Sequence, residues 1–215
     1  MFSGVQAKEA VRLYGIEFNK RGSYMVDNLD SYLEKAKALH GDCCAGIVLG
    51  TRLTLAALKA LDMDPTRHHK NLIVFVEIDR CMTDAVQAIT GCTLGHRTLK
   101  YVNYGKFGAI FYNMDNQRAV RVTEIRGPRQ NAGEDISSAF RSVPDEELVH
   151  IEEVTVKLDK KDLPGKPDQI EECGQCGELV FDDRSVLKSG KRLCLACADG
   201  SYYTPCQPTG KKIAD

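Results

Sequence analysis

The chain has 215 residues, of which 43% are hydrophobic and 27% are charged, so it can build a sizeable hydrophobic core. Its 29 basic and 30 acidic residues nearly cancel, which removes any overall electrostatic reason to expect a nucleic-acid partner. No apolar run approaches the roughly 20 residues of a membrane span. Residues 1–19 mix charged with apolar side chains, unlike a secretory signal, so we expect a cytoplasmic protein.

Two helices are predicted near the N-terminus. In residues 27–39, apolar side chains recur at helical spacing, which indicates an amphipathic helix. The segment from about residue 46 to residue 62 repeats this spacing with more apolar positions, and Pro65 lies just beyond its end. We therefore expect the second helix to be largely buried.

A strand and a short helix follow. Residues 71–79 form a continuous β-branched and aromatic run, which predicts a strand covered on both faces at the centre of a sheet. Residues 83–91 are typical of a short helix closed by Gly91. Cys81 is thus placed at a strand-to-helix junction, where ligand sites are common.

The next segments alternate with turns, as successive antiparallel strands do. The predicted strands are residues 98–104, 106–112 and 119–125. A helix start near residues 143–147 and a further strand at residues 151–158 follow. The elements together predict an α+β fold, with an antiparallel or mixed sheet packed against helices.

A charged stretch at residues 159–168, which contains two prolines and a glycine, is typical of a linker. We therefore expect a core domain at residues 1–158 and a small second domain at residues 169–215.

Four cysteines mark the second domain: Cys173, Cys176, Cys194 and Cys197. Their spacing, Cys-x2-Cys-x17-Cys-x2-Cys, is that of two thiolate pairs closing one tetrahedral zinc site. A segment this short buries little apolar surface, whereas structural Zn²⁺ contributes on the order of 10 kcal/mol. Two disulfides or an iron site would fit the same spacing, but a reducing compartment favours zinc. Cys206 has no assigned role.

A second cluster lies between the two predicted helices, in the sequence His40-Gly41-Asp42-Cys43-Cys44-Ala45-Gly46. A thiol at a helix N-terminus is favoured as thiolate by the helix dipole. With Cys81 from the strand-to-helix junction, His40 and Cys44 supply an imidazole and two thiolates, a set that suits zinc or another borderline-soft transition metal with an open coordination position. Simple burial of Cys43, Cys44 and Cys81 as small core side chains is the alternative.

The sequence also suggests roles for four other polar residues. Arg52, among apolar neighbours, requires either a carboxylate of the protein or an anionic group on a ligand. We expect Cys92, next to Gly91, to be a packing residue of the core. We expect His68 and His69 to lie at the surface.

Residues 40–52 resemble the signature His-Gly-His-x-Cys-Pro-Gly-x-x-x-Gly-x-Arg of the E subunit of formylmethanofuran dehydrogenase and its relatives. Residues 77–87, 91–95 and 104–106 resemble the later blocks of that family. The resemblance covers roughly residues 35–125, and the zinc module matches a C-terminal extension that many members carry. It implies an α+β core, a homodimer, and a groove that contains the histidine and cysteine residues.

Carried over to this chain, the resemblance implies catalytic or metal-binding roles for His40, Cys44 and Cys81. It also gives Asp84 and Lys106 as polar companions, for which a helix-terminal carboxylate and a solvated lysine are the plainer alternatives.

The chain departs from the signature at two positions. Asp42 stands in place of the second histidine and Ala45 in place of the proline, so a metal at this site would have an altered ligand set. A carboxylate can still bind zinc.

Three functions remain open from the sequence. The first is a metal-binding accessory or ligand-binding protein of molybdenum- or tungsten-dependent one-carbon metabolism, with formylmethanofuran or formate dehydrogenase subunits as partners. No ligand motif of a pterin or iron-sulfur centre is visible in the chain. The second is a metal- or thiolate-dependent enzyme acting on a small substrate at His40, Cys44 and Cys81. The third is a zinc-ribbon adaptor, for which the acidic residues of the module favour protein over nucleic acid.

Overall fold

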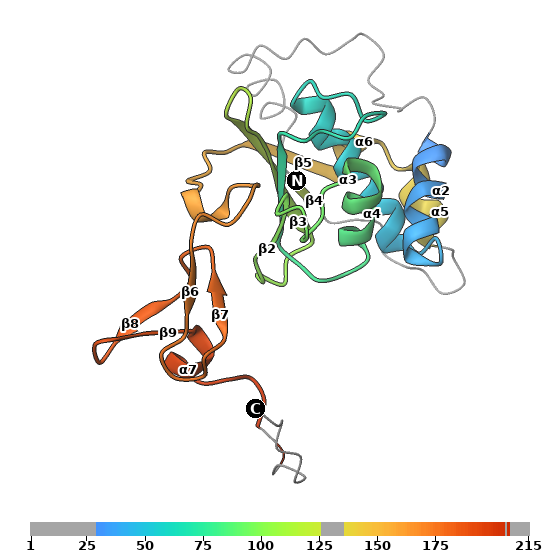
Figure 1. The fold of residues 1–215 in the computed structure, drawn as a ribbon. Helices are drawn as coiled ribbons and strands as arrows, with labels where there is room; N and C mark the ends of the chain where they lie inside the picture. The colour runs from blue at the N-terminus through green and yellow to red at the C-terminus, as the bar shows by residue number, and fades with distance from the viewer. Residues whose placement is uncertain (1–28, 126–135, 205, 207–215) are drawn as a thin grey trace. The chain divides into compact units, whose positions relative to one another are not determined.

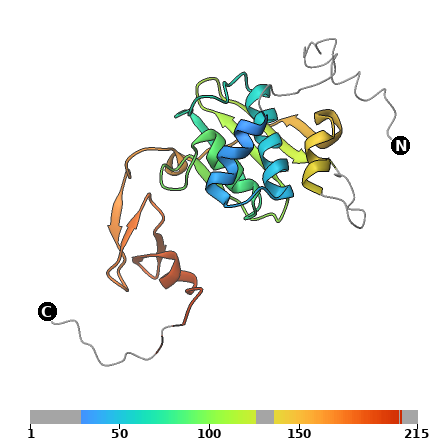
Figure 2. The same cartoon turned by 90° about the vertical axis from the view of Figure 1, so that its right-hand side faces the viewer.

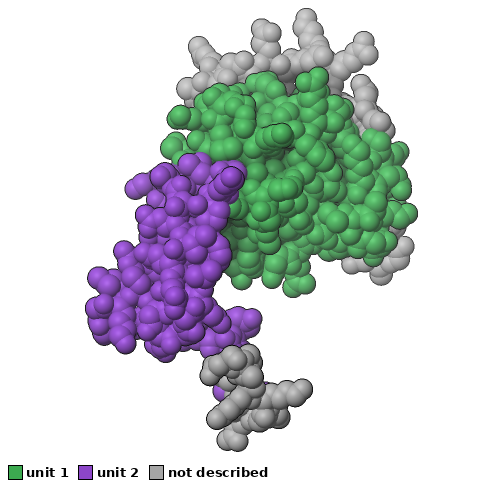
Figure 3. All heavy atoms as spheres, viewed as in Figure 1, with its two compact units in different colours: residues 1–156 green, residues 157–215 purple. Residues whose placement is uncertain are grey.

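The computed structural model describes residues 29–125, 136–204 and 206. The chain divides into two compact units, residues 1–156 and residues 157–215, shown in different colours in Figure 3. Within the described ranges, no helix is both long enough and apolar enough to cross a membrane.

Unit 1 alternates helices with the strands of one sheet (Figure 1). Its helices are α2 (Leu29–His40), α3 (Ala45–Ala60), α4 (Met82–Thr90), α5 (Ile136–Ser142) and α6 (Asp145–Leu148). Its strands are β1 (Leu72–Val76), β2 (Leu99–Tyr101), β3 (Gly108–Asn113), β4 (Arg118–Glu124) and β5 (Val149–Glu153). These elements confirm the predicted α+β fold.

The five strands form a mixed sheet in the order β2-β1-β3-β4-β5. β1 pairs in parallel with β2, with Val74 opposite Leu99, and every other pair is antiparallel. The predicted buried strand is therefore inside the sheet, but its expected central position is wrong, because β3 occupies the middle. An apolar run reports that a strand is largely buried, as β1 is, and carries no information about its place in the order of strands.

The helices α2, α3, α4 and α5 lie together on one face of this sheet (Figures 1 and 2). Leu72, Val74 and Val76 alternate along β1 and belong to the core cluster that these helices complete. α3 is buried along most of its length, because it packs against α2 and α4 as well as against β4. The ends of three helices are thereby held close together beside the sheet.

Gly50 sets how closely α3 approaches α4. A Cβ atom at this position would lie 2.7 Å from the Cα atom of Met82 and 3.2 Å from the Cβ atom of Ala85. The first contact is with backbone, so the side chain of any other residue would force the two helices apart. Glycine thus allows the N-terminus of α4, where Cys81 lies, to pack against α3.

We predict that Gly50→Ala destabilises unit 1 by about 1–3 kcal/mol, the usual cost of overpacking a well-filled core. Helix propensity alone gives the opposite sign, since alanine is favoured over glycine by about 1 kcal/mol inside a helix. Gly95→Ala is the matched control, because a Cβ atom there meets nothing within 4 Å. Urea unfolding of both variants measures the difference, and a Gly50→Ala variant as stable as the wild type would refute the close approach.

Unit 2 begins with a short 3-10 helix, η1 (Lys160–Asp162), followed by two short hairpins and an α-helix. The hairpins are β6 (Ile170–Glu172) with β7 (Leu179–Phe181), and β8 (Val186–Lys188) with β9 (Lys191–Leu193), and the helix is α7 (Leu195–Asp199). Among the described residues of this unit, the buried core cluster consists of Cys173, Leu193 and Ala198. So small a core leaves most of the stability to be supplied by something other than apolar burial.

Candidate metal centres

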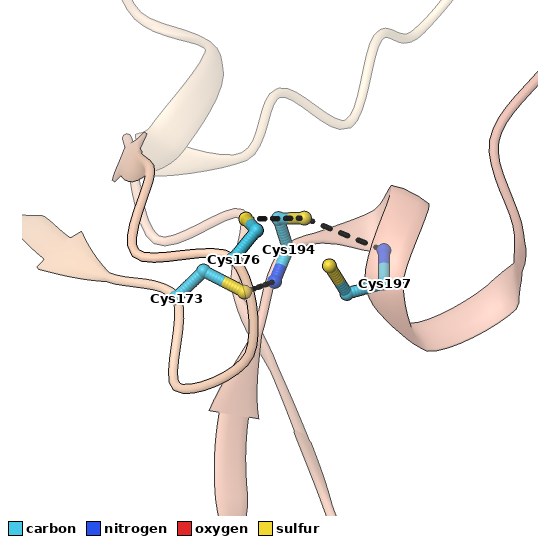
Figure 4. Close-up of side chains that lie close together, drawn as sticks. All are labelled: Cys173, Cys176, Cys194 and Cys197. Atoms are coloured by element: carbon cyan, nitrogen blue, oxygen red, sulfur yellow. Dashed lines mark hydrogen bonds between the residues drawn. The ribbon is translucent and has the colours of Figure 1, made fainter. Parts of the chain in front are cut away.

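The four cysteines of unit 2 converge as the spacing predicts. Cys173 and Cys176 lie in the turn between β6 and β7, and Cys194 and Cys197 lie at the start of α7. Their sulfur atoms all lie within 4.8 Å of one another (Figure 4). Backbone N–H groups support the sulfurs: Cys194 donates to the Sγ atom of Cys173 at 3.3 Å, and Cys197 donates to that of Cys194 at 3.4 Å. The arrangement fits one tetrahedral metal ion.

The electrostatics of this cluster favour a dication. Backbone N–H groups, first that of Cys176 and then that of Cys194, lower the pKa of Cys173 to about 6. The neighbouring Cys194 and, second, burial raise the pKa of Cys197 to about 12. Four crowded sulfurs cannot all ionise unaided, whereas a bound Zn²⁺ ion stabilises every thiolate.

A second cluster forms in unit 1, where the ends of its helices meet. His40 ends α2, Cys44 is the N-cap of α3, and Cys81 is the N-cap of α4. One ligand atom from each of the three side chains lies within 4.8 Å of the others, and all three residues are partly buried. The Nε2 atom of His40 lies 3.8 Å from the Sγ atom of Cys44. The structure therefore brings together the three residues that the sequence proposed as ligands.

Two glycines make this meeting possible. Gly41 follows α2 with a φ of +103°, a conformation that other residues rarely adopt, and it turns the chain from α2 toward α3. Gly46 lies opposite Cys81: a Cβ atom there would be 3.0 Å from the Cβ atom of Cys81 and 3.8 Å from the Sγ atom of Cys44. The two thiols can be neighbours because no side chain stands between them.

Asp84 orients the histidine. Its Oδ2 atom accepts a hydrogen bond from the Nδ1 atom of His40 at 2.8 Å, and its Oδ1 atom accepts one from the amide of Gln87 at 3.3 Å. The bond from Asp84 is the largest cause of a raised pKa of His40. In neutral imidazole it places the proton on Nδ1 and leaves the Nε2 lone pair directed toward the thiols, as in a carboxylate–histidine–metal arrangement.

The two thiols differ in acidity. Burial raises the pKa of Cys44, but the N–H groups at the start of α3, the Cys81 thiol and His40 together hold that pKa below its ordinary value. Burial, followed by the adjacent Cys44, raises the pKa of Cys81. Cys44 is therefore the more acidic thiol of the pair, and a bound dication would stabilise both sulfurs as thiolates.

We predict that Asp84→Ala weakens zinc binding at His40, Cys44 and Cys81 by about 10- to 100-fold, the usual cost of losing an outer-shell carboxylate. Gln87→Ala, which removes only the longer contact to Asp84, should have a smaller effect. Competition with a chromophoric chelator, in full-length protein whose four-cysteine site is filled, measures both affinities. Wild-type affinity in Asp84→Ala would show that the carboxylate does not orient a metal ligand.

The other predicted site residues lie elsewhere. Lys106 is exposed in the segment after β2, with its ammonium 5.8 Å from the centre of the Tyr104 ring. Cys92 is buried in the core, and its thiol donates to the carbonyl of Leu72 at 3.5 Å, as expected of a packing residue. Cys43 is partly buried and faces Arg141 at 3.9 Å.

Arg52 takes the protein partner rather than a ligand. Its side chain is only 9% exposed, and its guanidinium binds the carboxylate of Asp145 and the carbonyls of Phe140 and Val143. It thereby fastens α3 to the segment that carries α5 and α6.

Sequence reasoning missed Asp145 and Gln87. Gln87 follows Asp84 by three residues in α4, so helical spacing placed it beside that carboxylate. Asp145 lies 93 residues from Arg52, and nothing in the local sequence of either residue links them.

Comparison with known proteins places these centres in context. Residues 39–147 match the family model described as "FmdE, Molybdenum formylmethanofuran dehydrogenase operon". Residues 169–203 match the family model of the prokaryotic dksA/traR C4-type zinc finger. The matched range contains Cys173, Cys176, Cys194 and Cys197.

Two individual proteins are similar to the chain. An FmdE-like protein of the tungsten formylmethanofuran dehydrogenase type from Syntrophus aciditrophicus, known from its crystal structure, is 26% identical with a TM-score of 0.60. The match covers 82% of this chain and 95% of that one. A "Probable S-adenosyl-L-methionine-binding protein" of Archaeoglobus fulgidus is 28% identical over 203 residues, covering 81% of this chain. The match spans 54% of that relative, or about half its length.

Proposed function

The chain belongs to the FmdE family, and from this premise we propose that unit 1 binds a transition metal ion at His40, Cys44 and Cys81. We propose further that the protein has an accessory or ligand-binding role in molybdenum- or tungsten-dependent one-carbon metabolism. One observation carries the proposal: three ligand atoms from three helix ends converge within 4.8 Å, and Asp84 holds the histidine with its free nitrogen toward the thiols.

The donor set selects the metal. One imidazole nitrogen and two sulfurs suit Zn²⁺ or a similar borderline-soft ion, and three protein ligands leave a position for an exogenous group. Cys44 and Cys81 would bind as thiolates, His40 through Nε2, while Asp84 keeps the proton on Nδ1. A metal held in this way supplies a Lewis acid.

X-ray absorption at the zinc edge of the full-length protein tests the metal site. If both centres are filled, we expect a nitrogen or oxygen shell at about 2.0–2.1 Å beside the sulfur shell at about 2.3 Å. His40→Ala should remove part of the lighter shell. A sulfur shell alone in the wild type would confine zinc to unit 2 and overturn the proposal.

The accessory role rests on the name of the family, which refers to molybdenum formylmethanofuran dehydrogenase, and on that of the Syntrophus aciditrophicus relative, which refers to the tungsten enzyme. It is tested by deleting the gene in its host and measuring the activity and the molybdenum or tungsten content of the host's formylmethanofuran or formate dehydrogenase. We expect both to fall and to return with the wild-type gene but not with Cys44→Ser. Unchanged activity and metal content would exclude the role. The archaeal relative's name adds S-adenosylmethionine as a ligand to titrate.

A thiolate-dependent enzyme is the second candidate. Asp84, His40 and Cys44 form a chain of contacts at 2.8 and 3.8 Å, which is the order of orienting group, base and nucleophile. A sulfur bound to metal is protected, so alkylation by iodoacetamide separates the two functions. Cys44 protected by bound zinc supports the metal site, whereas turnover that survives complete metal removal and ends on alkylation supports the nucleophile.

A further inference from the structure

Asp42 lies in the short connection between α2 and α3, two residues after His40 and two before Cys44. Its Oδ1 atom is 3.6 Å from the Nε2 atom of His40, the nitrogen that Asp84 leaves free. The Asp42 side chain is 75% exposed, whereas that of His40 is 21% exposed. The carboxylate therefore lies at the solvent side of the cluster.

Within the described part of the chain, Asp42 has no second structural role. The N-cap of α3 is Cys44, and no side-chain hydrogen bond caps that helix. Among the residues that the structure describes, the polar partner of Asp42 is His40.

The separations fit a common metal ion. With bonds of about 2.0–2.1 Å to nitrogen and oxygen and about 2.3 Å to sulfur, a tetrahedral ion holds a nitrogen and an oxygen about 3.3 Å apart, and a nitrogen and a sulfur about 3.6 Å apart. The observed distances from the Nε2 atom of His40 are 3.6 Å to Asp42 and 3.8 Å to Cys44. Asp42 is not within the group of ligand atoms that all lie within 4.8 Å. Rotation of the exposed Asp42 side chain toward the cluster would add its carboxylate to the ligand atoms of His40, Cys44 and Cys81.

We propose that Asp42 is the fourth protein ligand of the metal in unit 1, a carboxylate that closes the coordination sphere at rest and rotates out when an exogenous ligand binds. The proposal rests on the proposed function, since it requires a metal at His40, Cys44 and Cys81. Two thiolates and a carboxylate give a bound dication a net charge of −1. The closed site therefore disfavours small anions and admits neutral or cationic ligands that can displace the carboxylate.

The test is titration of Co²⁺ into full-length protein that already holds one zinc ion in its four-cysteine site. Thiolate-to-cobalt absorption reports binding by the cysteines, and the visible d–d bands report the number and kind of the other ligands. In Asp42→Ala we expect the affinity to fall by about 10-fold or more, at least as much as for an outer-shell group. We also expect the d–d bands to shift as water replaces the carboxylate.

Asp79→Ala is the matched control. Asp79 is an exposed carboxylate two residues before Cys81, and its charge acts on Tyr101. It should leave both the affinity and the spectrum unchanged. An Asp42→Ala variant with the wild-type affinity and spectrum would overturn the assignment of Asp42 alone. Absence of thiolate-to-cobalt absorption in the wild type would instead overturn the proposed function on which the assignment rests.

Discussion

Loss of zinc from the four-cysteine site should unfold unit 2 and leave unit 1 folded. Structural zinc of this type contributes about 10–16 kcal/mol, and the described part of unit 2 has only three buried residues in its core cluster. We therefore expect Cys176→Ser, in the full-length chain, to remove hydrogen-exchange protection from β6 to α7. The amides of β3 and β4 should keep their protection, because the core cluster of unit 1 contains none of these cysteines.

The matched control for this experiment is Cys206→Ser. Cys206 is exposed and lies outside the group of four sulfurs, so its substitution should change neither the zinc content nor the protection of unit 2. Protection from β6 to α7 that persists in Cys176→Ser would mean that apolar packing, rather than metal, holds the unit together.

Arg52→Met should destabilise unit 1 by about 3–5 kcal/mol, the cost of removing one partner of a buried ion pair. The substitution roughly preserves the volume of the stem. It leaves the carboxylate of Asp145 without its cation and the carbonyls of Phe140 and Val143 without a donor. Urea unfolding at neutral pH measures the loss, and a change below about 1 kcal/mol would contradict the proposed anchoring of α5 and α6.

Arg141→Met serves as the control for removal of an arginine. Arg141 is 41% exposed and pairs with Asp30, which is 82% exposed, so this variant should lose no more than about 1 kcal/mol from the ion pair. The comparison separates the cost of stranding a buried charge from the loss of a surface contact.

The deficit of Arg52→Met should depend on pH. Burial raises the pKa of Asp145 even though Arg52 opposes the shift, and without the guanidinium the pKa rises further. When the pKa of a carboxyl group is higher in the folded state than in the unfolded state, where it is about 3.9, the free energy of unfolding falls as the pH rises. This loss takes place between the unfolded pKa and the folded pKa. The deficit should therefore shrink as the pH falls through this window, where Asp145 is buried in its neutral form.

The sequence predicted both clusters, for different reasons. The spacing of Cys173, Cys176, Cys194 and Cys197 is a local signal, because each pair lies within a single turn of chain. The cluster of His40, Cys44 and Cys81 forms only because two helix ends and a strand-to-helix junction meet in the fold. Helical periodicity and the glycines located those ends, the ligand types of His40, Cys44 and Cys81 indicated the grouping, and resemblance to a known family supported it.

The limits of sequence reasoning lie in long-range order. The predicted strand 71–79 ends at Val76 in the structure, because the chain then turns with the carboxylate of Glu77 buried against Arg121, 44 residues away. The place of β3 between β1 and β4, and the ion pair of Arg52, likewise depend on segments far apart in sequence. Periodicity within a segment carries no information about which distant segment will be its neighbour.

Metal content of the full-length protein, purified without oxygen and analysed beside Cys44→Ser, tests the central claim most directly. Two metal ions per wild-type chain and one per Cys44→Ser chain are the predicted values, since the substitution removes a ligand of the core site and spares the four-cysteine site. One zinc ion in both proteins would place all the metal in unit 2, and His40, Cys44 and Cys81 would then not form a metal centre.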